Sequence, residues 1–246
     1  MSKSYKICHC TKFDKTEFTN NALDLNTQPH LAFFEDSPDK PITRITRYTT
    51  GHIFKDFSQY LIEHEHNVNV KGRYQDRRFN EFFRMGEING YHSEKTGLFL
   101  MQGKKDDILD FCKFTDKSRL LDLNTIEIQM SDLLDKLGSV NNGWFKFSQG
   151  SIKTSALFGS HLESTDEFIA AKEVGDISAL SFFYKDNDLS HAIMVTVDGT
   201  VVLQHNYPNT QIEIDLVLKI KKDLLDGIYN EVPAGRRKGK ISLDKT

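Results

Sequence analysis

The segment His191–His205, HAIMVTVDGTVVLQH, carries the strongest fold signal in the sequence. Asp198-Gly199 separates two apolar, β-branched runs, which is typical of a tight β-hairpin because a type I′ turn requires positive φ at both central residues. A two-residue turn at this point would fix which side chains share a face of the hairpin. The first face is then predicted to carry Ala192, Met194, Thr196, Val201, Leu203 and His205, and the second His191, Ile193, Val195, Val202 and Gln204. Both faces are largely apolar, so we expect a central pair of strands that is covered on both sides.

The sequence before the hairpin predicts a third strand and a helix. Residues 177–184 form an apolar run that a short connection joins to the hairpin, and short connections favour antiparallel neighbours. Ser164 and Glu167 form a capping box for a helix that Gly175 ends. We therefore expect a three-stranded antiparallel unit over residues 177–205 that buries both of its faces.

Two patterns compete after the hairpin. Alternating apolar residues from Ile212 to Ile220 suit a strand, whereas Thr210 and Glu213 form a capping box directly after Pro208. We favour a helix from residue 211 to about 229. The remaining elements expected in this part are strands at 98–101, within 120–129, around 143–147 and at 152–158, and helices at 104–114 and at 132–137, the last capped by Ser131.

The N-terminal third predicts a strand at residues 4–10 and then two helices, at about 50–64 and at 74–85. Apolar residues in both segments follow the three-and-four spacing of a helix face. These positions are Ile53, Phe57, Tyr60 and Leu61 in the first helix and Phe79, Phe82 and Phe83 in the second.

The polar turn NGYHSEKT, residues 89–96, is the expected domain boundary. The predicted fold class is α+β, with a predominantly antiparallel sheet and flanking helices in the C-terminal part and a smaller α+β N-terminal part. In this division residues 1–90 form the N-terminal part with its basic helices, 97–232 form the C-terminal sheet domain, and 233–246 form a basic flexible tail.

Composition excludes several classes of protein. The net charge is -3, which gives no overall attraction to nucleic acid or acidic membranes. The N-terminus lacks the apolar stretch of a secretory signal, and three sparse cysteines, Cys8, Cys10 and Cys112, do not form a disulfide framework. We expect a cytoplasmic protein without a cofactor, a metal site or a membrane partner. Phosphate-binding loops, dinucleotide fingerprints, paired CxxC motifs and nucleophile elbows are missing from the sequence.

Basic residues gather in one region despite the acidic balance. Six of the nine arginines lie between Arg44 and Arg84. Arginine offers planar bidentate donors to phosphate, and Tyr74 would stack on a base. The candidate nucleic-acid-binding residues are Lys71, Arg73, Arg77, Arg78 and Arg84 at the second helix, with Arg236, Arg237, Lys238 and Lys240 in the tail. The plainer interpretation is a solvated helix face on which Arg77 pairs with Glu81.

The leading interpretation is an intracellular protein that binds DNA, RNA or another polyanion, alone or within a nucleic-acid-processing assembly. An alternative is an enzyme acting on nucleic acid or a nucleotide, with Arg47, His52, Asp122 or Glu127 near the chemistry, although no residue is assigned as catalytic. A second alternative is a subunit of a larger complex or a homo-oligomer without its own catalysis. His64 and His66 point apart on the predicted helix, so we interpret His64 as a packed histidine rather than a metal ligand.

Overall fold

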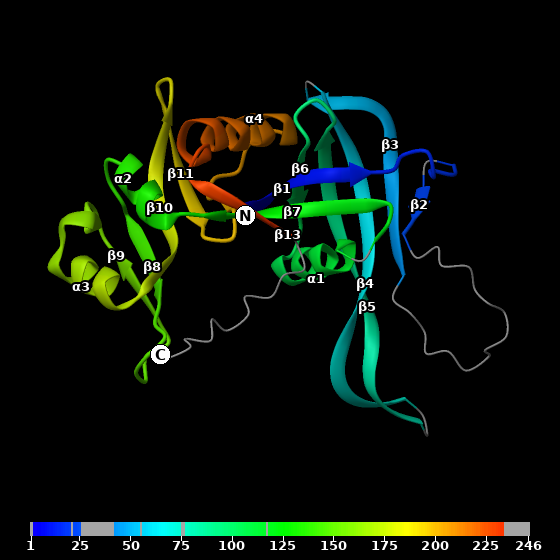
Figure 1. Ribbon diagram of the computed structural model, residues 1–246, viewed down its shortest axis with the longest axis horizontal. Coiled ribbons are helices and arrows are strands. Elements are labelled where there is room, and N and C mark those ends of the chain that lie inside the picture. The colour runs from blue at the N-terminus through cyan, green and yellow to red at the C-terminus, as the bar shows by residue number, and fades with distance from the viewer. Residues whose placement is uncertain are drawn as a thin grey trace, which may run out of the picture. The chain divides into compact units, whose positions relative to one another are not determined.

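The computed structural model describes residues 2–20, 22–25, 42–54, 56–74, 77–116 and 118–233, without the side chains of 49–54, 74, 77 and 79–81. Two compact units contain them, the first formed by residues up to 8 together with 125–232 and the second by 9–124. Strands β1 (Lys3–Phe13) and β7 (Leu121–Ile128) each run from one unit into the other. Antiparallel strands make up most of the regular structure, with helices beside them, as the sequence predicts (Figure 1). The turn predicted at 89–96 was wrong in part, because residues 89–93 belong to a strand and only 94–96 form a turn. All of them lie inside the second unit, and the predicted domain division stays a prediction.

The predicted hairpin is present at the centre of the first unit. Its strands, β11 and β12, lie between β10 and β1, so three consecutive antiparallel strands form here as expected. The strand order in this unit is β1-β12-β11-β10-β8-β9. The bounds are β8 Asn142–Lys146, β9 Thr154–Phe158, β10 Asp176–Asp186, β11 Leu189–Thr196 and β12 Thr200–Leu203, with β13 (Tyr229–Pro233) paired to β7.

The register of the hairpin differs from the prediction by one residue. Val195 lies opposite Val201 and Ile193 lies opposite Leu203. These four side chains therefore share one face, and all are fully buried. The predicted faces were wrong, because they placed Ile193 and Val195 on one side of the hairpin and Val201 and Leu203 on the other.

The cause of the shift is a three-residue loop in place of a two-residue turn. The N–H of Gly199 donates to the carbonyl of Thr196 at 3.0 Å, and Gly199 has a φ of +75°. This arrangement is a turn followed by one glycine in the left-handed conformation, a common three-residue loop between the strands of a hairpin. Met194 and Val202 consequently share the other face, where they are only half-buried, so the hairpin is fully buried on one side only.

Helix α4 (Thr210–Ile220) confirms the helical interpretation of this segment and packs on the buried face. Glu213 is 1% exposed and receives hydrogen bonds from the Lys3 ammonium, at 2.7 Å, and from the Tyr5 hydroxyl. The N-cap of α4 is Asn209, whose side chain accepts a hydrogen bond from the N–H of Ile212. Helix α4 ends at Ile220, earlier than predicted. A π-helical segment at Lys221–Leu225 and then β13 follow it.

The two shorter helices of this unit also form where expected, with different caps. Helix α3 (Asp166–Val174) begins after Thr165, whose hydroxyl accepts from the N–H of Phe168, and ends at Gly175 as predicted. Helix α2 (Met130–Lys136) starts before Ser131, so Ser131 is not its cap. A single 3₁₀ turn, Leu162–Ser164, precedes α3.

Both helices predicted in the N-terminal third were wrong, because that region forms a sheet. Strand order in the second unit is β2-β3-β4-β5-β6-β1. The bounds are β2 Ala22–Asp24, β3 Thr43–Phe54, β4 Phe57–Tyr74, β5 Arg77–Ser93 and β6 Leu98–Gln102, with helix α1 at Lys105–Thr115. In β4 Ser58, Tyr60, Ile62 and His64 are buried at alternate positions, as in a strand, and Phe57 at its start is also buried. A histidine at a buried position hides this alternation from a search for apolar residues.

The loop at Gly199 gives a direct test of the first unit. A Cβ on Gly199 would lie 2.2 Å from Ile126 Cγ1 and 2.8 Å from the Ile126 carbonyl oxygen, whereas Gly227, with a φ of +83°, has no heavy atom within 4 Å of the corresponding position. We expect Gly199→Ala to lower the free energy of unfolding by about 3 kcal/mol, through overpacking and positive φ together. Gly227→Ala should cost only about 1 kcal/mol, from positive φ alone. Urea denaturation measures both, and equal losses would contradict the described loop.

Candidate functional site

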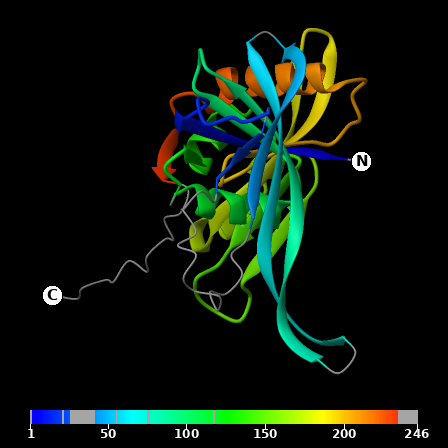
Figure 2. The same ribbon diagram turned by 90° about the vertical axis from the view of Figure 1, so that its right-hand side faces the viewer.

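The basic residues predicted at the second helix lie instead on an extended part of the β4–β5 hairpin. Strand β3 pairs with β4 only as far as His64, and β6 pairs with β5 only over residues 89–92. Among the described strands, β4 and β5 therefore pair only with each other between residues 67 and 84. We call residues 67–74 and 77–84 the basic arm. Figure 2 shows it continuing past the end of β3 as a two-stranded ribbon.

Two arginines of the basic arm lie directly opposite each other. Arg73 on β4 is the cross-strand partner of Arg78 on β5, and both side chains are exposed, as is that of Lys71. A register shift between Asn69 and Gly72 immediately precedes this pair. Like charges at directly opposed positions destabilise an antiparallel pair. The arrangement therefore places two positive charges at facing positions near the end of the ribbon.

Apolar side chains are exposed beside these charges. Val70 is 46% exposed and Phe82 is 43% exposed. The prediction that Phe82 belongs to the core was wrong, because a two-stranded ribbon has no second layer to bury it. An aromatic ring next to arginines is a combination that stacks on unpaired bases. Tyr74, predicted for that role, and Arg77 both have side chains outside those described.

Arg84 differs from the other arginines because it contacts α1. It donates to Asp107 at 2.7 Å, and the Asp107 side chain is only 4% exposed. His66 Nδ1 lies 3.7 Å from the same carboxylate oxygen. A Cβ on Gly86 would lie 2.7 Å from Asp107 Cγ, so the carboxylate sits tightly on the hairpin. The Arg84–Asp107 pair thus joins α1 to the base of the arm.

His64 and His66 share one face of β4, since residues two apart in a strand point to the same side. The prediction that they diverge depended on a helix and was wrong. His64 Nδ1 lies 2.8 Å from Thr43 Oγ1, and His64 Nε2 lies 3.3 Å from Asp110. Burial lowers the pKa of His64, with the Asp110 hydrogen bond opposing the shift. His64 is therefore a packed histidine, as the sequence suggested.

The residues considered for catalysis are not assembled into a site. Arg47 is exposed on β3 and His52 is on the same strand, so the single helix that would bring an Arg and a His together at this spacing is not formed. Asp122 accepts a hydrogen bond from Thr11 at 2.6 Å in the second unit, whereas Glu127 belongs to the first. Within the described residues, no group of three His, Cys, Asp or Glu side chains is placed to hold a metal ion.

The four basic residues predicted in the tail, at 236, 237, 238 and 240, lie outside the described residues and stay predictions. In the described chain, no helix has the length and apolar character needed to cross a membrane.

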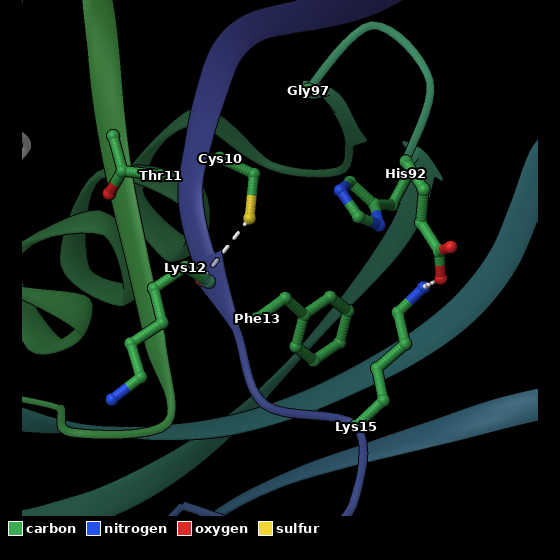
Figure 3. Close-up of a pocket in the computed structure, with 8 residues that line it drawn as sticks. Cys10, Thr11, Lys12, Phe13, Lys15, His92 and Gly97 are labelled. Carbon is green, nitrogen blue, oxygen red and sulfur yellow. Dashed lines mark hydrogen bonds and ion pairs between the residues drawn. The ribbon is translucent and has the colours of Figure 1, made fainter.

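A cleft of about 360 Å³ opens in the second unit, beside the end of β1 and the turn that follows β5. It is lined by residues 10–13, Lys15, His92, Glu94 and Gly97. The N–H of Cys10 donates to the carbonyl of Gly97 at 2.7 Å, which joins the two segments. In Figure 3 the side chains of Cys10, Phe13 and His92 converge on the opening.

His92 is the most unusual group in this cleft. It is 5% exposed, and its buried Nδ1 has no hydrogen-bond partner among the described residues. Burial, and then the positive charge of Lys15, lower the pKa of His92 to about 4. Its ring centre lies 5.5 Å from that of Phe13 and 5.7 Å from that of Phe99. The cleft therefore contains a neutral imidazole with an unsatisfied nitrogen at neutral pH, a condition that is rare outside functional sites.

Lys15 supplies positive charge at the same place. Its ammonium pairs with Glu94, whose pKa this hydrogen bond lowers, and lies 5.4 Å from the ring centre of Phe13 and 5.8 Å from that of Tyr60. The buried hydroxyl of Tyr60 also lacks a hydrogen-bond partner among the described residues. The Tyr60 hydroxyl and His92 Nδ1 thus both lack a hydrogen-bond partner among the described residues, and the rings of both residues contact Phe13.

Cys10 is not an activated nucleophile. Its Sγ lies 3.2 Å from the Lys12 carbonyl oxygen, and burial raises the pKa of the thiol to about 11. A thiol of this kind is protonated at neutral pH, and the thiolate is the reactive form. The cleft is therefore suited to binding rather than to thiolate chemistry.

Sequence reasoning missed this cleft because its two halves are distant in the chain. It assigned residues 89–96 to a boundary turn and interpreted Cys8 and Cys10 as a buried pair, of which only Cys8 is fully buried. The one local signal was the polar run from His92 to Lys95, which ends β5 and enters the turn after it, since binding residues gather in the loops that follow strands.

No model of a known protein family matches this chain, and no curated protein matches it either.

The contact between Arg84 and Asp107 predicts a structural role for this arginine. We expect Arg84→Ala to lower the free energy of unfolding by about 1 to 3 kcal/mol, because it removes the closest positive partner of a buried carboxylate. The double variant Arg84→Ala, Asp107→Asn should recover part of the lost free energy of unfolding, since it removes the uncompensated charge of the Asp107 carboxylate. Thermal and urea denaturation measure this, and full stability of Arg84→Ala would contradict the assigned role.

The depressed pKa of His92 predicts a loss of stability in acid. Between about pH 6.5 and about pH 4 the unfolded chain binds a proton that folded His92 does not, so stability falls as the pH decreases through this window. Lowering the pH from about 7.5 to about 5 should cost about 1 to 2 kcal/mol through this residue, allowing for screening at the open cleft. We expect His92→Phe to remove this loss of stability between about pH 7.5 and about pH 5. The control variant His205→Gln, at an exposed histidine, should leave the pH dependence of stability unchanged. Identical pH dependence in wild type and His92→Phe would refute the assignment.

Proposed function

We propose that the protein binds nucleic acid through the basic arm, with duplex DNA as the preferred form. The observation that carries the proposal is the directly opposed pair of exposed arginines, Arg73 and Arg78, on a projecting ribbon. Guanidinium groups bind phosphate oxygens with two hydrogen bonds, so two exposed arginines at facing positions of a ribbon suit a phosphate backbone.

The charge of the arm supports the same proposal. Residues 67–84 contain five basic and two acidic residues, whereas the whole chain carries a net charge of -3. This stretch is therefore locally basic in an acidic chain, although Arg84 is paired with Asp107. Electrostatic attraction of this local kind supplies the sequence-independent part of nucleic-acid affinity.

The shape of the arm favours DNA over duplex RNA. The major groove of B-DNA admits a two-stranded β-ribbon, whereas the major groove of A-form RNA is too narrow for side chains to read. Phe82, exposed on the arm, adds an aromatic surface next to the charges. This ring would contact a base where the duplex is opened or kinked.

The triple variant Lys71→Ala, Arg73→Ala, Arg78→Ala tests the proposal. We expect the affinity of the wild-type chain for a duplex DNA of mixed sequence to fall steeply with salt, measured by fluorescence anisotropy. The triple variant should flatten the slope of log K against log salt by about 0.9 for each phosphate that the protein no longer neutralises. A duplex RNA of the same sequence should bind more weakly to the wild type.

The matched control is Lys146→Ala, Lys172→Ala, Lys222→Ala, which removes the same charge from exposed positions of the first unit. It should leave the salt slope unchanged. Circular dichroism should show that both triple variants remain folded, so that a change in the salt slope reports on binding. Undetectable binding to both duplexes, or equal losses of affinity in the two triple variants, would overturn the proposal.

A further inference from the structure

The cleft in the second unit combines three kinds of group whose chemistry defines a ligand. Phe13 presents an aromatic ring, His92 presents a neutral imidazole with a buried unsatisfied nitrogen, and Lys15 presents a cation. All three belong to the same compact unit and line the same opening (Figure 3).

The imidazole selects a neutral hydrogen-bonding partner. The ring of His92 lines the cleft, although its Nδ1 is buried and is not the atom that a ligand in the cleft reaches. A neutral imidazole carries one donor and one acceptor nitrogen, so it suits a group with polar atoms on a planar edge. The Phe13 ring beside it favours a planar, aromatic partner that can stack.

Lys15 selects an anion at the rim of the same cleft. Its ammonium lies on the side of His92, whereas the Lys12 side chain points away from the opening (Figure 3). The pair between Lys15 and Glu94 involves a carboxylate that is 74% exposed, and exposed pairs contribute about 0 to 1 kcal/mol. A ligand anion can therefore replace Glu94 as the partner of Lys15 at little cost.

We propose that this cleft binds a nucleotide, with the base beside Phe13 and His92 and the phosphate at Lys15. A nucleotide joins a neutral, planar heterocycle with hydrogen-bonding edges to an anionic group, and these are the two features that the lining residues select. The cleft volume of about 360 Å³ lies within the range of about 300 to 1,000 Å³ that small-molecule sites occupy. The nucleotide can be free or can be an unpaired residue of a strand, since both present the same chemistry. This inference uses no residue of the basic arm.

Isothermal titration calorimetry of the full chain with AMP, GMP, CMP and UMP tests the inference. We expect at least one of the four to bind with a Kd below about 1 mM. The matching nucleoside, which lacks the phosphate, and ribose 5-phosphate, which lacks the base, should both bind at least about tenfold more weakly. Absence of saturable binding by all four nucleotides would overturn the inference.

Variants identify the cleft as the site. His92→Phe and Lys15→Met should each weaken nucleotide binding at least fivefold, and Glu94→Gln should tighten it because it frees Lys15. Lys104→Met, which removes an exposed charge elsewhere in the same unit, should have no effect. Circular dichroism confirms that each variant is folded. Unchanged affinity in both His92→Phe and Lys15→Met would place the nucleotide elsewhere and overturn the inference.

Two comparisons separate this inference from the proposed function. The arm variant Lys71→Ala, Arg73→Ala, Arg78→Ala should keep full nucleotide affinity, so loss of duplex binding alone leaves the cleft inference intact. A single-stranded trinucleotide of the preferred base should also require His92 and Lys15. Tighter binding of the trinucleotide than of the mononucleotide assigns the cleft to an unpaired strand. Tighter binding of the mononucleotide assigns the cleft to a free nucleotide. Both results support nucleotide recognition.

Discussion

The second unit depends on the continuous pairing of β4 with β5. This pairing runs from Phe57 opposite Ser93 to Tyr74 opposite Arg77. Strands β3 and β6 add to its two edges, and α1 packs on one of its faces. One end of the pair carries the basic arm and the other carries His92 at the cleft. Because side chains alternate between faces, a slip of one residue would turn both sites to the opposite side of the sheet.

The sequence predicts the elements whose signals are local. The hairpin at Asp198-Gly199, the strand before it and the helix after Pro208 all form, because turns and caps are encoded by a few adjacent residues. Boundaries and registers are less well predicted, since neighbouring residues compete for the same role. Asn209 caps α4 in place of Thr210, and a third loop residue moves the hairpin register by one.

The N-terminal sheet and the cleft could not be predicted because both depend on distant pairing. The arm has no buried face to impose an alternation, and the spacing of Phe79 and Phe82 imitates a helix. The residues of the cleft come from the end of β1 and the turn after β5, which the Cys10–Gly97 hydrogen bond brings together. The basic residues of the arm do lie near one another, but Arg84 stabilises α1 and only the opposed arginines remain as the centre of the proposed interface.

Mapping where nucleic acid touches the protein tests binding by the basic arm most directly. Photocrosslinking of the full chain to duplex DNA, followed by mass spectrometry of the crosslinked peptides, identifies the contact residues without altering the sequence. Binding through the arm should give crosslinks within residues 67–84, with Phe82 among them, that weaken as the salt concentration rises. Crosslinks confined to residues outside 67–84 would contradict it.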